Sequence, residues 1–437
     1  MTARQTSTLA ALRHGEFRWL FSGLVAANLG LWMQEFALGW LVVQLAVRDG
    51  NPALAGFYLG LRSLAGAVPA LAFGLFAGVY ADRTDRRQLL IITRVASAIV
   101  AVVLAILVIT DHVNIFIVML LSAAATAAFA FDMPGRHAIL PSVVPPRDLF
   151  SAVGLMRASM QAAHAIGPLI AGLLIVPIGI GGVLLAKAAL VTASIGAMLP
   201  MKPRPAHAGA RDLGVLASLR EGVSHMRRDD LIRWCVILQI SFALLAQAFM
   251  QLLPAVAVET LRVGATELSW LVGAVGVGAL VGAFLIASVA RVERRGRLML
   301  GAFLGIGAAL VLLGVQRELV GAVVVLVTLG VLQQVFLGTL TVTLQLAAPD
   351  RLRGRVMGIQ SVVFMGGGPL GVIAIGTLGT FIGVSNAILI GGLAVLVVAI
   401  IVGLRVPVIR ELRGQLVPAT RREAAAFAAS SGADGAE

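Results

Sequence analysis

The chain has 437 residues, of which 59% are hydrophobic and 13% are charged, and its net charge is +13. Soluble domains average about 25% charged residues, so this chain carries too little charge to cover soluble surfaces. Its mean hydropathy of +0.97 indicates a helical protein that crosses a membrane many times. The composition therefore excludes a soluble enzyme, a disordered chain and a fibrous protein.

Twelve apolar segments are each long enough to cross a bilayer, which takes about 20 residues per helix. We predict an all-α polytopic membrane protein with two pseudo-symmetric six-helix bundles. The predicted spans are 18–46, 53–80, 88–110, 114–131, 151–176, 178–200, 232–258, 267–290, 298–316, 319–346, 354–382 and 384–406. The predicted domains are an N-tail (1–17), a first bundle (18–200), a basic linker (201–231), a second bundle (232–407) and a disordered tail (408–437).

The distribution of basic residues predicts the orientation of the chain. Of the 34 Lys and Arg residues, 27 lie in the two tails, the linker and every second loop, and 3 lie in the other loops. Because basic loops stay on the cytoplasmic side, this bias places both termini in the cytoplasm, in the plasma membrane of a bacterium. The positive charge is therefore explained by orientation, and we expect no nucleic-acid partner.

The two halves of the chain repeat short motifs in the same order. A Gly-Arg pair follows the fourth and the tenth predicted spans, and a Gly-Pro pair lies in the fifth and the eleventh. These pairs are Gly135-Arg136, Gly354-Arg355, Gly167-Pro168 and Gly368-Pro369. Related halves are the architecture of secondary transporters, which bind solute near the midplane of the membrane.

A ten-residue motif follows the second predicted span. It resembles the signature G-x-L-A-D-[RK]-x-G-[RK]-[RK] of the major facilitator superfamily and departs from it at Tyr80, where the family has Leu, and at Asp85, where the family has Gly. The matching residues are Gly78, Ala81, Asp82, Arg83, Arg86 and Arg87. The resemblance implies that this loop gates the cytoplasmic side during transport. The alternative for Arg86 and Arg87 is that they only mark topology.

Further motifs narrow the resemblance to one branch. The loop after the fourth predicted span carries Asp132, Pro134 and Arg136, and the eleventh span opens with another short motif, Arg353, Gly354 and Arg355. Together they resemble the enterobactin-exporter-like and macrolide-efflux-like branch. The resemblance implies proton-coupled export of small amphiphilic or hydrophobic molecules, such as drugs, macrolides or siderophores, by alternating access.

The fifth predicted span carries Gly167, Pro168 and Gly172, which resemble the antiporter motif G-P-x-x-G-G. Proline bends a helix and small neighbours permit close crossing, so a packing kink is the alternative. Proton-coupled drug exporters often carry an Arg within helix four. The segment 114–131 has no charged residue, so that element is missing from the predicted span.

Glu35 is the only carboxylate well inside a predicted span. A charge within the membrane is costly and marks a functional site, so Glu35 is our candidate for proton or cationic-substrate coupling. Arg62 on the second span is its expected partner, and a structural ion pair is the alternative. His164 is a third candidate because histidine changes charge near neutral pH; a packed neutral histidine is the alternative. We expect Lys187 to extend its amine outward to the membrane surface.

Several amides lie on the first, seventh and tenth spans, which line the central cavity in the superfamily. The substrate-cavity candidates are Asn28, Gln34, Gln239, Gln247, Gln251, Gln333 and Gln334. Hydrogen bonds between helices are an equal alternative for these amides.

Other functions have weaker support. The chain has no Walker A motif, no visible nucleophile–base pair and a single cysteine, Cys235, so we predict no enzyme, no metal and no cofactor. The expected partners are membrane lipid, a small-molecule substrate and protons, and we expect a monomer. The alternatives are a transporter of lysophospholipids or other lipid-like solutes, and a non-transporting receptor or scaffold with the same fold.

Overall fold

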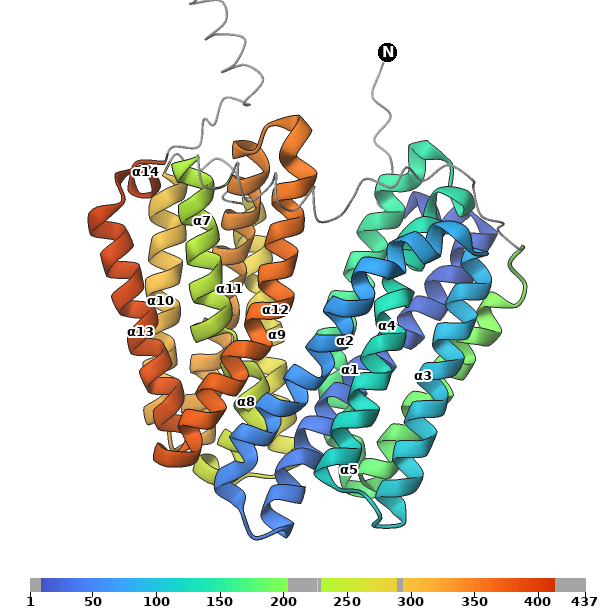
Figure 1. The fold of residues 1–437 in the computed structure, drawn as a ribbon, viewed down its shortest axis with the longest axis horizontal. Coiled ribbons are helices and arrows are strands. Elements are labelled where there is room, and N and C mark those ends of the chain that lie inside the picture. Colours follow the sequence, from blue (N-terminus) through green and yellow to red (C-terminus); the bar gives the residue numbers. More distant parts are fainter. Residues whose placement is uncertain (1–8, 203–225, 227–228, 289–293, 413–437) are drawn as a thin grey trace, which may run out of the picture. The chain divides into compact units, whose positions relative to one another are not determined.

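The computed structural model describes residues 9–202, 226, 229–288 and 294–412, and in these residues helices are joined by short connections without a β-strand. The first half contains η1 (Ala10–Arg13), α1 (Gly15–Arg48), η2 (Pro52–Leu54), α2 (Ala55–Arg83), α3 (Arg86–Ile109), α4 (Ile115–Val143), η3 (Pro146–Asp148) and α5 (Leu149–Met198) (Figure 1). The second half contains α7 (Asp230–Ser241), η4 (Phe242–Ala246), α8 (Ala248–Val256), η5 (Ala257–Leu261), α9 (Ala265–Ser288), α10 (Arg295–Val315), α11 (Leu319–Ala347), α12 (Asp350–Ile382), α13 (Val384–Arg405) and α14 (Pro407–Arg410). The predicted all-α fold is confirmed.

Eleven described segments are long and apolar enough to cross a membrane. One of them, Pro146–Met198, has 53 residues and would be about 80 Å long as a straight helix, more than twice the thickness of the hydrocarbon core. Gly179 interrupts it with φ 69° and ψ 174°, a conformation that residues with a Cβ avoid. The segment therefore makes two spans, which reconciles the eleven helices with the twelve predicted spans.

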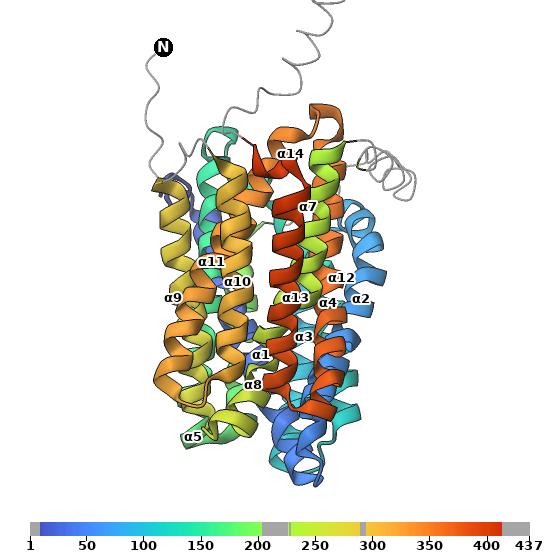
Figure 2. The ribbon, with the colours of Figure 1, turned by 90° about the vertical axis from the view of Figure 1, so that its left-hand side faces the viewer.

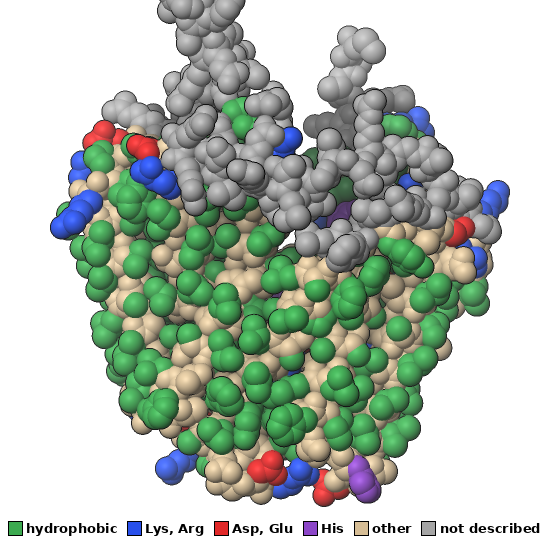
Figure 3. Space-filling view, in the orientation of Figure 1, with side chains coloured by type: hydrophobic (Ala, Val, Ile, Leu, Met, Phe, Trp, Pro, Cys, Tyr) green, Lys and Arg blue, Asp and Glu red, His purple; other side chains and the backbone are tan. Residues whose placement is uncertain are grey.

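Hydrophobic side chains cover the flanks of the helices on the face shown in Figure 3, and the coloured charged side chains gather at the helix ends. Asparagine or aspartate side chains cap several of these ends. Asn114 accepts from the Ile117 N–H (2.9 Å) at the start of α4, and Asp229 accepts from the Ile232 N–H (3.0 Å) at the start of α7. Each cap satisfies a backbone donor that the first helical turn leaves free.

The described chain forms two compact units. The first contains the residues up to 202 together with Gln251–Gly273 and Gly376–Val384, and the second contains most of the remaining residues. Within the first unit, α1 packs against α5, α2 against α4, and α3 against both α4 and α5. Phe17, Leu20 and Leu90 belong to its buried hydrophobic core. The predicted domain boundaries at 200 and 232 stay a prediction.

The second unit is built around α7, α10 and α11, and α10 and α11 run side by side (Figure 2). Phe336 stacks on Phe303 with ring centroids 4.9 Å apart and lies 5.3 Å from the ring of Phe242. Phe242 begins η4, a π-helical segment within the seventh span. Residues 408–412, which we assigned to the tail, lie in α14 and the turn after it, and the Leu412 carbonyl accepts from Gly296 (3.2 Å) at the start of α10.

The structure corrects the end of the fourth span. We expected it to end at residue 131, but α4 continues to Val143 with Pro134 and Pro141 inside it. Proline is tolerated within a membrane helix because neighbouring groups satisfy the freed backbone. Gly135 packs closely on α3, since a Cβ there would lie 3.1 Å from Leu90. Asp132 and Arg136, expected in a loop, are therefore one helical turn apart inside α4.

Candidate functional site

Glu35 on α1 and Arg62 on α2 form an ion pair. The Arg62 Nη2 donates to the Glu35 Oε2 at 3.0 Å, which confirms the pairing expected from the sequence. The two side chains differ in exposure: that of Arg62 is 8% exposed and that of Glu35 is 40% exposed. The guanidinium is thus held in the protein interior while the carboxylate remains accessible on one side.

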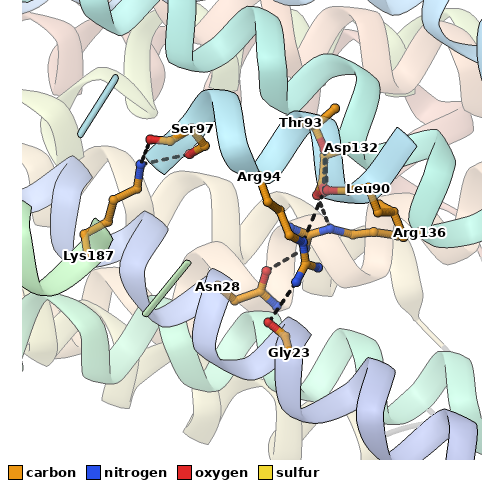
Figure 4. Close-up of polar contacts among 9 residues, drawn as sticks. All are labelled: Gly23, Asn28, Leu90, Thr93, Arg94, Ser97, Asp132, Arg136 and Lys187. Carbon is orange, nitrogen blue, oxygen red and sulfur yellow. Dashed lines mark hydrogen bonds and ion pairs between the residues drawn. The ribbon is translucent and has the colours of Figure 1, made fainter. Parts of the chain in front are cut away.

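Lys187 lies on the second span of α5 and is 2% exposed. Its Nζ donates to the Ser97 carbonyl (2.7 Å) and to the Ser97 Oγ (2.8 Å) on α3 (Figure 4). Its aliphatic stem packs on Gly30 of α1, where a Cβ would lie 3.1 Å from the lysine Cγ. The expectation that Lys187 reaches the membrane surface is wrong, because this face of α5 packs against α1 and α3 and not against lipid.

A buried cluster of charges joins α1, α3 and α4 (Figure 4), and a hydrogen bond to Ser159 connects it to α5. Asp132 pairs with Arg136 one turn further along α4 and with the Arg94 Nε at 3.7 Å. Thr93 also donates to Asp132 (3.4 Å). Asp132 is 4% exposed and Arg94 is 3% exposed, so one carboxylate lies between two guanidinium groups in the interior.

Asn28 belongs to this charge cluster. Its Oδ1 accepts from the Arg136 Nη1 (2.6 Å), and its Nδ2 donates to the Ser159 Oγ (3.2 Å) on α5. Both ends of the amide thus bond to other helices, which favours the helix-joining alternative over substrate contact. Arg94 donates to the Gly23 carbonyl (3.2 Å) on α1 and completes the connection of the four helices.

Sequence reasoning missed this cluster, and Glu35 is not the only carboxylate well inside a span. Asp132 fell outside the predicted span only because Pro134 suggested a helix end. The i, i+4 spacing of Asp132 and Arg136 was a usable signal, since such residues face one another on a helix. Arg94, isolated in an apolar stretch, was a second signal. The absence of charge from residues 114–131 is real, but α4 as a whole contains charged residues.

His164 stacks against Trp32 of α1, with ring centroids 4.0 Å apart. It is partly buried, which fits the packed-histidine alternative. One turn further on, Gly167 lies so close to α1 that a Cβ would be 2.7 Å from the Trp32 Cβ. Pro168 is inside α5, and Gly172 lies against Ser269 of α9. The antiporter-like motif therefore packs on α1 at one end and on α9 at the other.

The glutamines proposed for the substrate cavity have different surroundings. Gln239 is buried and donates to the Gln360 carbonyl (2.9 Å) on α12, so it joins two helices. Gln247 follows η4 and packs on Gly368, where a Cβ would lie 3.2 Å from the amide carbon. The remaining candidates are buried or partly buried: Gln34, Gln251, Gln333 and Gln334. Among the described residues, the Oε1 atoms of Gln34, Gln239 and Gln247 are buried acceptors without a donor.

The signature motif after the second span lies across a helix end and a helix start. The side chains of Gly78, Asp82 and Arg83 lie outside the described part of the structure. Arg86 donates to the Ala138 carbonyl (2.9 Å) on α4, and Arg87 donates to the Met198 carbonyl (3.0 Å) at the end of α5. These two arginines therefore fasten α3 to its neighbours within the first unit.

Asp85 departs from the family pattern and has a clear local role. Its carboxylate accepts from the Arg87 N–H (2.9 Å) and the Gln88 N–H (3.0 Å), which makes it the N-cap of α3. Its φ of −61° is ordinary, so this position does not need the freedom of glycine. In the second half, Arg353 donates to the Gln345 carbonyl (2.9 Å) at the end of α11, beside Gly354 and Arg355 in α12.

The described apolar helices make this a polytopic membrane protein, and its fold is similar to that of solved transporters. The peptide transporter POT, solved as a point mutant, superposes with a TM-score of 0.72 at 12% identity, covering 92% of this chain and 96% of that chain. The chain matches the transmembrane secretion effector family over residues 6–429 and belongs to this family of the major facilitator superfamily. The predicted superfamily is confirmed, and the family is one of transporters rather than enzymes.

Two curated relatives span nearly the whole chain. The multidrug efflux pump Tap of Mycolicibacterium fortuitum is 28% identical, covering 90% of this chain and 96% of its own length. The enterobactin exporter EntS of Shigella boydii is 25% identical, covering 92% of this chain and 94% of its own length. Both relatives are named as exporters. They therefore agree with the enterobactin-exporter-like and macrolide-efflux-like branch that the sequence motifs indicated.

Proposed function

We propose that the protein is a proton-driven exporter of small amphiphilic or hydrophobic molecules in the plasma membrane of a bacterium. The relatives named as multidrug and enterobactin exporters support this substrate range. Both termini lie in the cytoplasm, as the excess of basic residues in the tails and the linker indicates. Substrate binds near the midplane and reaches the two sides of the membrane in turn.

The Glu35–Arg62 ion pair carries the proposal. A carboxylate that accepts a proton loses its attraction for a guanidinium, and a carboxylate that releases the proton regains it. Because Glu35 is on α1 and Arg62 is on α2, the pair can translate proton binding into a looser or tighter contact between two spans. The exposure of Glu35 gives a proton or a cationic group of the substrate access to the pair.

Transport by the purified full-length chain in proteoliposomes tests the proposal. The substrates are a cationic dye, a macrolide, a catecholate siderophore and a lysophospholipid, each assayed with and without a pH gradient. We expect Glu35→Gln to lose gradient-driven accumulation and to keep exchange of substrate at equal pH. Asp49→Asn, which removes an exposed carboxylate at the end of the same helix, is the control and should behave as the wild type. Unchanged gradient-driven transport by Glu35→Gln would refute the proposed coupling.

A further inference from the structure

The amine of Lys187 lies deep in the membrane-spanning region. It is on the second span of α5, eight residues after the break at Gly179 and about 12 Å along the helix. Its partner Ser97 is near the middle of α3 (Arg86–Ile109). An ammonium group in this position has lost its hydration, which is costly unless other charges replace it.

The acceptors around the amine are neutral. Both described acceptors belong to Ser97, the carbonyl at 2.7 Å and the Oγ at 2.8 Å. Among the described residues, no carboxylate lies within ion-pair distance of the Lys187 Nζ. An ammonium has three N–H groups to donate, so its charge is held by two dipoles and by no opposite charge at close range.

The charged groups on the helices packed around Lys187 are few. On α1, the Lys187 stem packs on Gly30, and Glu35 lies further along the same helix, where it binds Arg62 of α2. On α3, Arg94 lies one turn from Ser97 and is held by Asp132 and by the Gly23 carbonyl. The second span of α5 carries no other ionisable residue. Glu35 is therefore the carboxylate that influences Lys187, and it is shared with Arg62.

Charge counting shows where a mobile proton is best placed. With Lys187 protonated, the set of Glu35, Arg62 and Lys187 has a net charge of +1, and with Lys187 neutral the set is balanced. Protonating Glu35 while Lys187 stays charged would leave two uncompensated cations in a medium of low dielectric constant. The set therefore holds at most one extra proton, on Lys187 or on Glu35, because low-dielectric surroundings disfavour the larger net charge.

Ser97 suits both protonation states of the amine. When Nζ is charged, the Ser97 carbonyl and hydroxyl oxygens both accept from it, as observed. When the proton leaves, Nζ keeps a lone pair, and the same hydroxyl can rotate and donate to that lone pair. The carbonyl continues to accept from a remaining N–H. Neither state leaves the amine without hydrogen bonds, so the hydrogen bonding at Ser97 permits both protonation states.

We propose that Lys187 is a proton-carrying residue of the transport cycle, whose proton state controls how firmly Glu35 binds Arg62. This inference rests on the proposed proton-driven export. Glu35 lies beyond ion-pair distance of Lys187, but a charged amine still attracts the carboxylate and so weakens its attraction to Arg62, whereas a neutral amine does not. Proton release from Lys187 thereby tightens the contact between α1 and α2, and proton uptake weakens it.

The composition of the chain allows a direct measurement on the unaltered protein. Its only lysines are Lys187 and Lys202, and Lys202 is exposed. With lysine labelled at Cε and Nζ, NMR spectra of the full-length protein show two side chains, and Lys202→Arg assigns them. We expect the Lys187 signal to titrate within the pH range that supports transport, while the Lys202 signal stays that of a charged amine. A Lys187 signal that does not change over this range would overturn the inference.

Transport assays give the second readout. Lys187→Arg keeps a permanent charge and should lose gradient-driven accumulation while retaining exchange at equal pH; Lys202→Arg is the matched control. Ser97→Ala removes a hydroxyl whose bond to the charged amine is stronger than its bond to the neutral amine, so the pH midpoint of coupled transport should move to lower values. Full coupled transport by Lys187→Arg, with an unchanged pH profile, would refute the role of Lys187. If the wild type shows no proton coupling at all, the proposed function fails, which is a different result from proton-coupled transport with an inert Lys187.

Discussion

Replacing Asp132 with asparagine removes the one carboxylate that serves two buried arginines. The side chain of Asp132 is 6% exposed, and those of Arg94 and Arg136 are 3% and 8% exposed, so water cannot replace the lost charge. Removing one partner of a buried ion pair costs about 3–5 kcal/mol. Because two guanidinium groups lose their counter-charge together, we expect the free energy of unfolding to fall by an amount near the upper end of this range.

Replacing Arg136 with methionine provides the comparison. It leaves Asp132 paired with Arg94 and removes the excess positive charge, at the cost of an unsatisfied Asn28 acceptor, worth about 1–3 kcal/mol. Asp132→Asn should therefore be the more damaging single change. The double variant should be more stable than the sum of the two single changes predicts, because the two residues are in contact.

Denaturant unfolding in mixed micelles measures the three free energies, and thermal unfolding midpoints provide a second ranking. If Arg136→Met destabilised the protein more than Asp132→Asn, the argument would be refuted. Wild-type stability of Asp132→Asn would show that the carboxylate does not compensate the arginines.

Three further changes have defined outcomes. Gly172→Ala places a methyl group against Ser269 of α9, so it should lower the thermal midpoint and impair transport, whereas Gly154→Ala, with open space around it, should do neither. Gly179→Ala forces a Cβ into a backbone conformation that is essentially restricted to glycine and should reduce the free energy of unfolding by about 1–3 kcal/mol. Asp85→Ala should cost about 1 kcal/mol by removing the N-cap of α3, while Asp85→Gly should cost only a few tenths; equal effects in a denaturant titration would contradict the capping role.

The Glu35–Arg62 pair could be predicted from the sequence. Hydropathy locates each residue along its span, and a short connection makes two spans neighbours, so two charges at similar depth are expected to meet. The kink at Gly179 was also accessible, because two apolar runs too long for one span must be separated somewhere near the glycines and Pro177.

The Asp132 cluster and Lys187 were not recovered, for two different physical reasons. The proline and glycine after Asp132 are usual helix-ending signals, and only packing against Leu90 and the other buried groups explains why α4 continues through them. For Lys187, the position along the span could be estimated from the sequence, but the sequence did not show which side of the helix the side chain lies on. If the helix were rotated by half a turn about its axis, Lys187 would face lipid and could extend its amine to the membrane surface, as we expected.

The sequence by itself determined that this is an all-helical membrane protein with twelve spans, and its motifs identified the superfamily, because span length and apolar composition are properties of each segment alone. Only the tertiary structure decided which charges meet. It placed Asp132 between Arg94 and Arg136, joined Asn28 to Ser159, and set Lys187 on Ser97, with no carboxylate of the described residues within ion-pair distance. Such contacts depend on the rotation of each helix about its axis and on the helices it packs against, and both are set by long-range packing rather than by local composition.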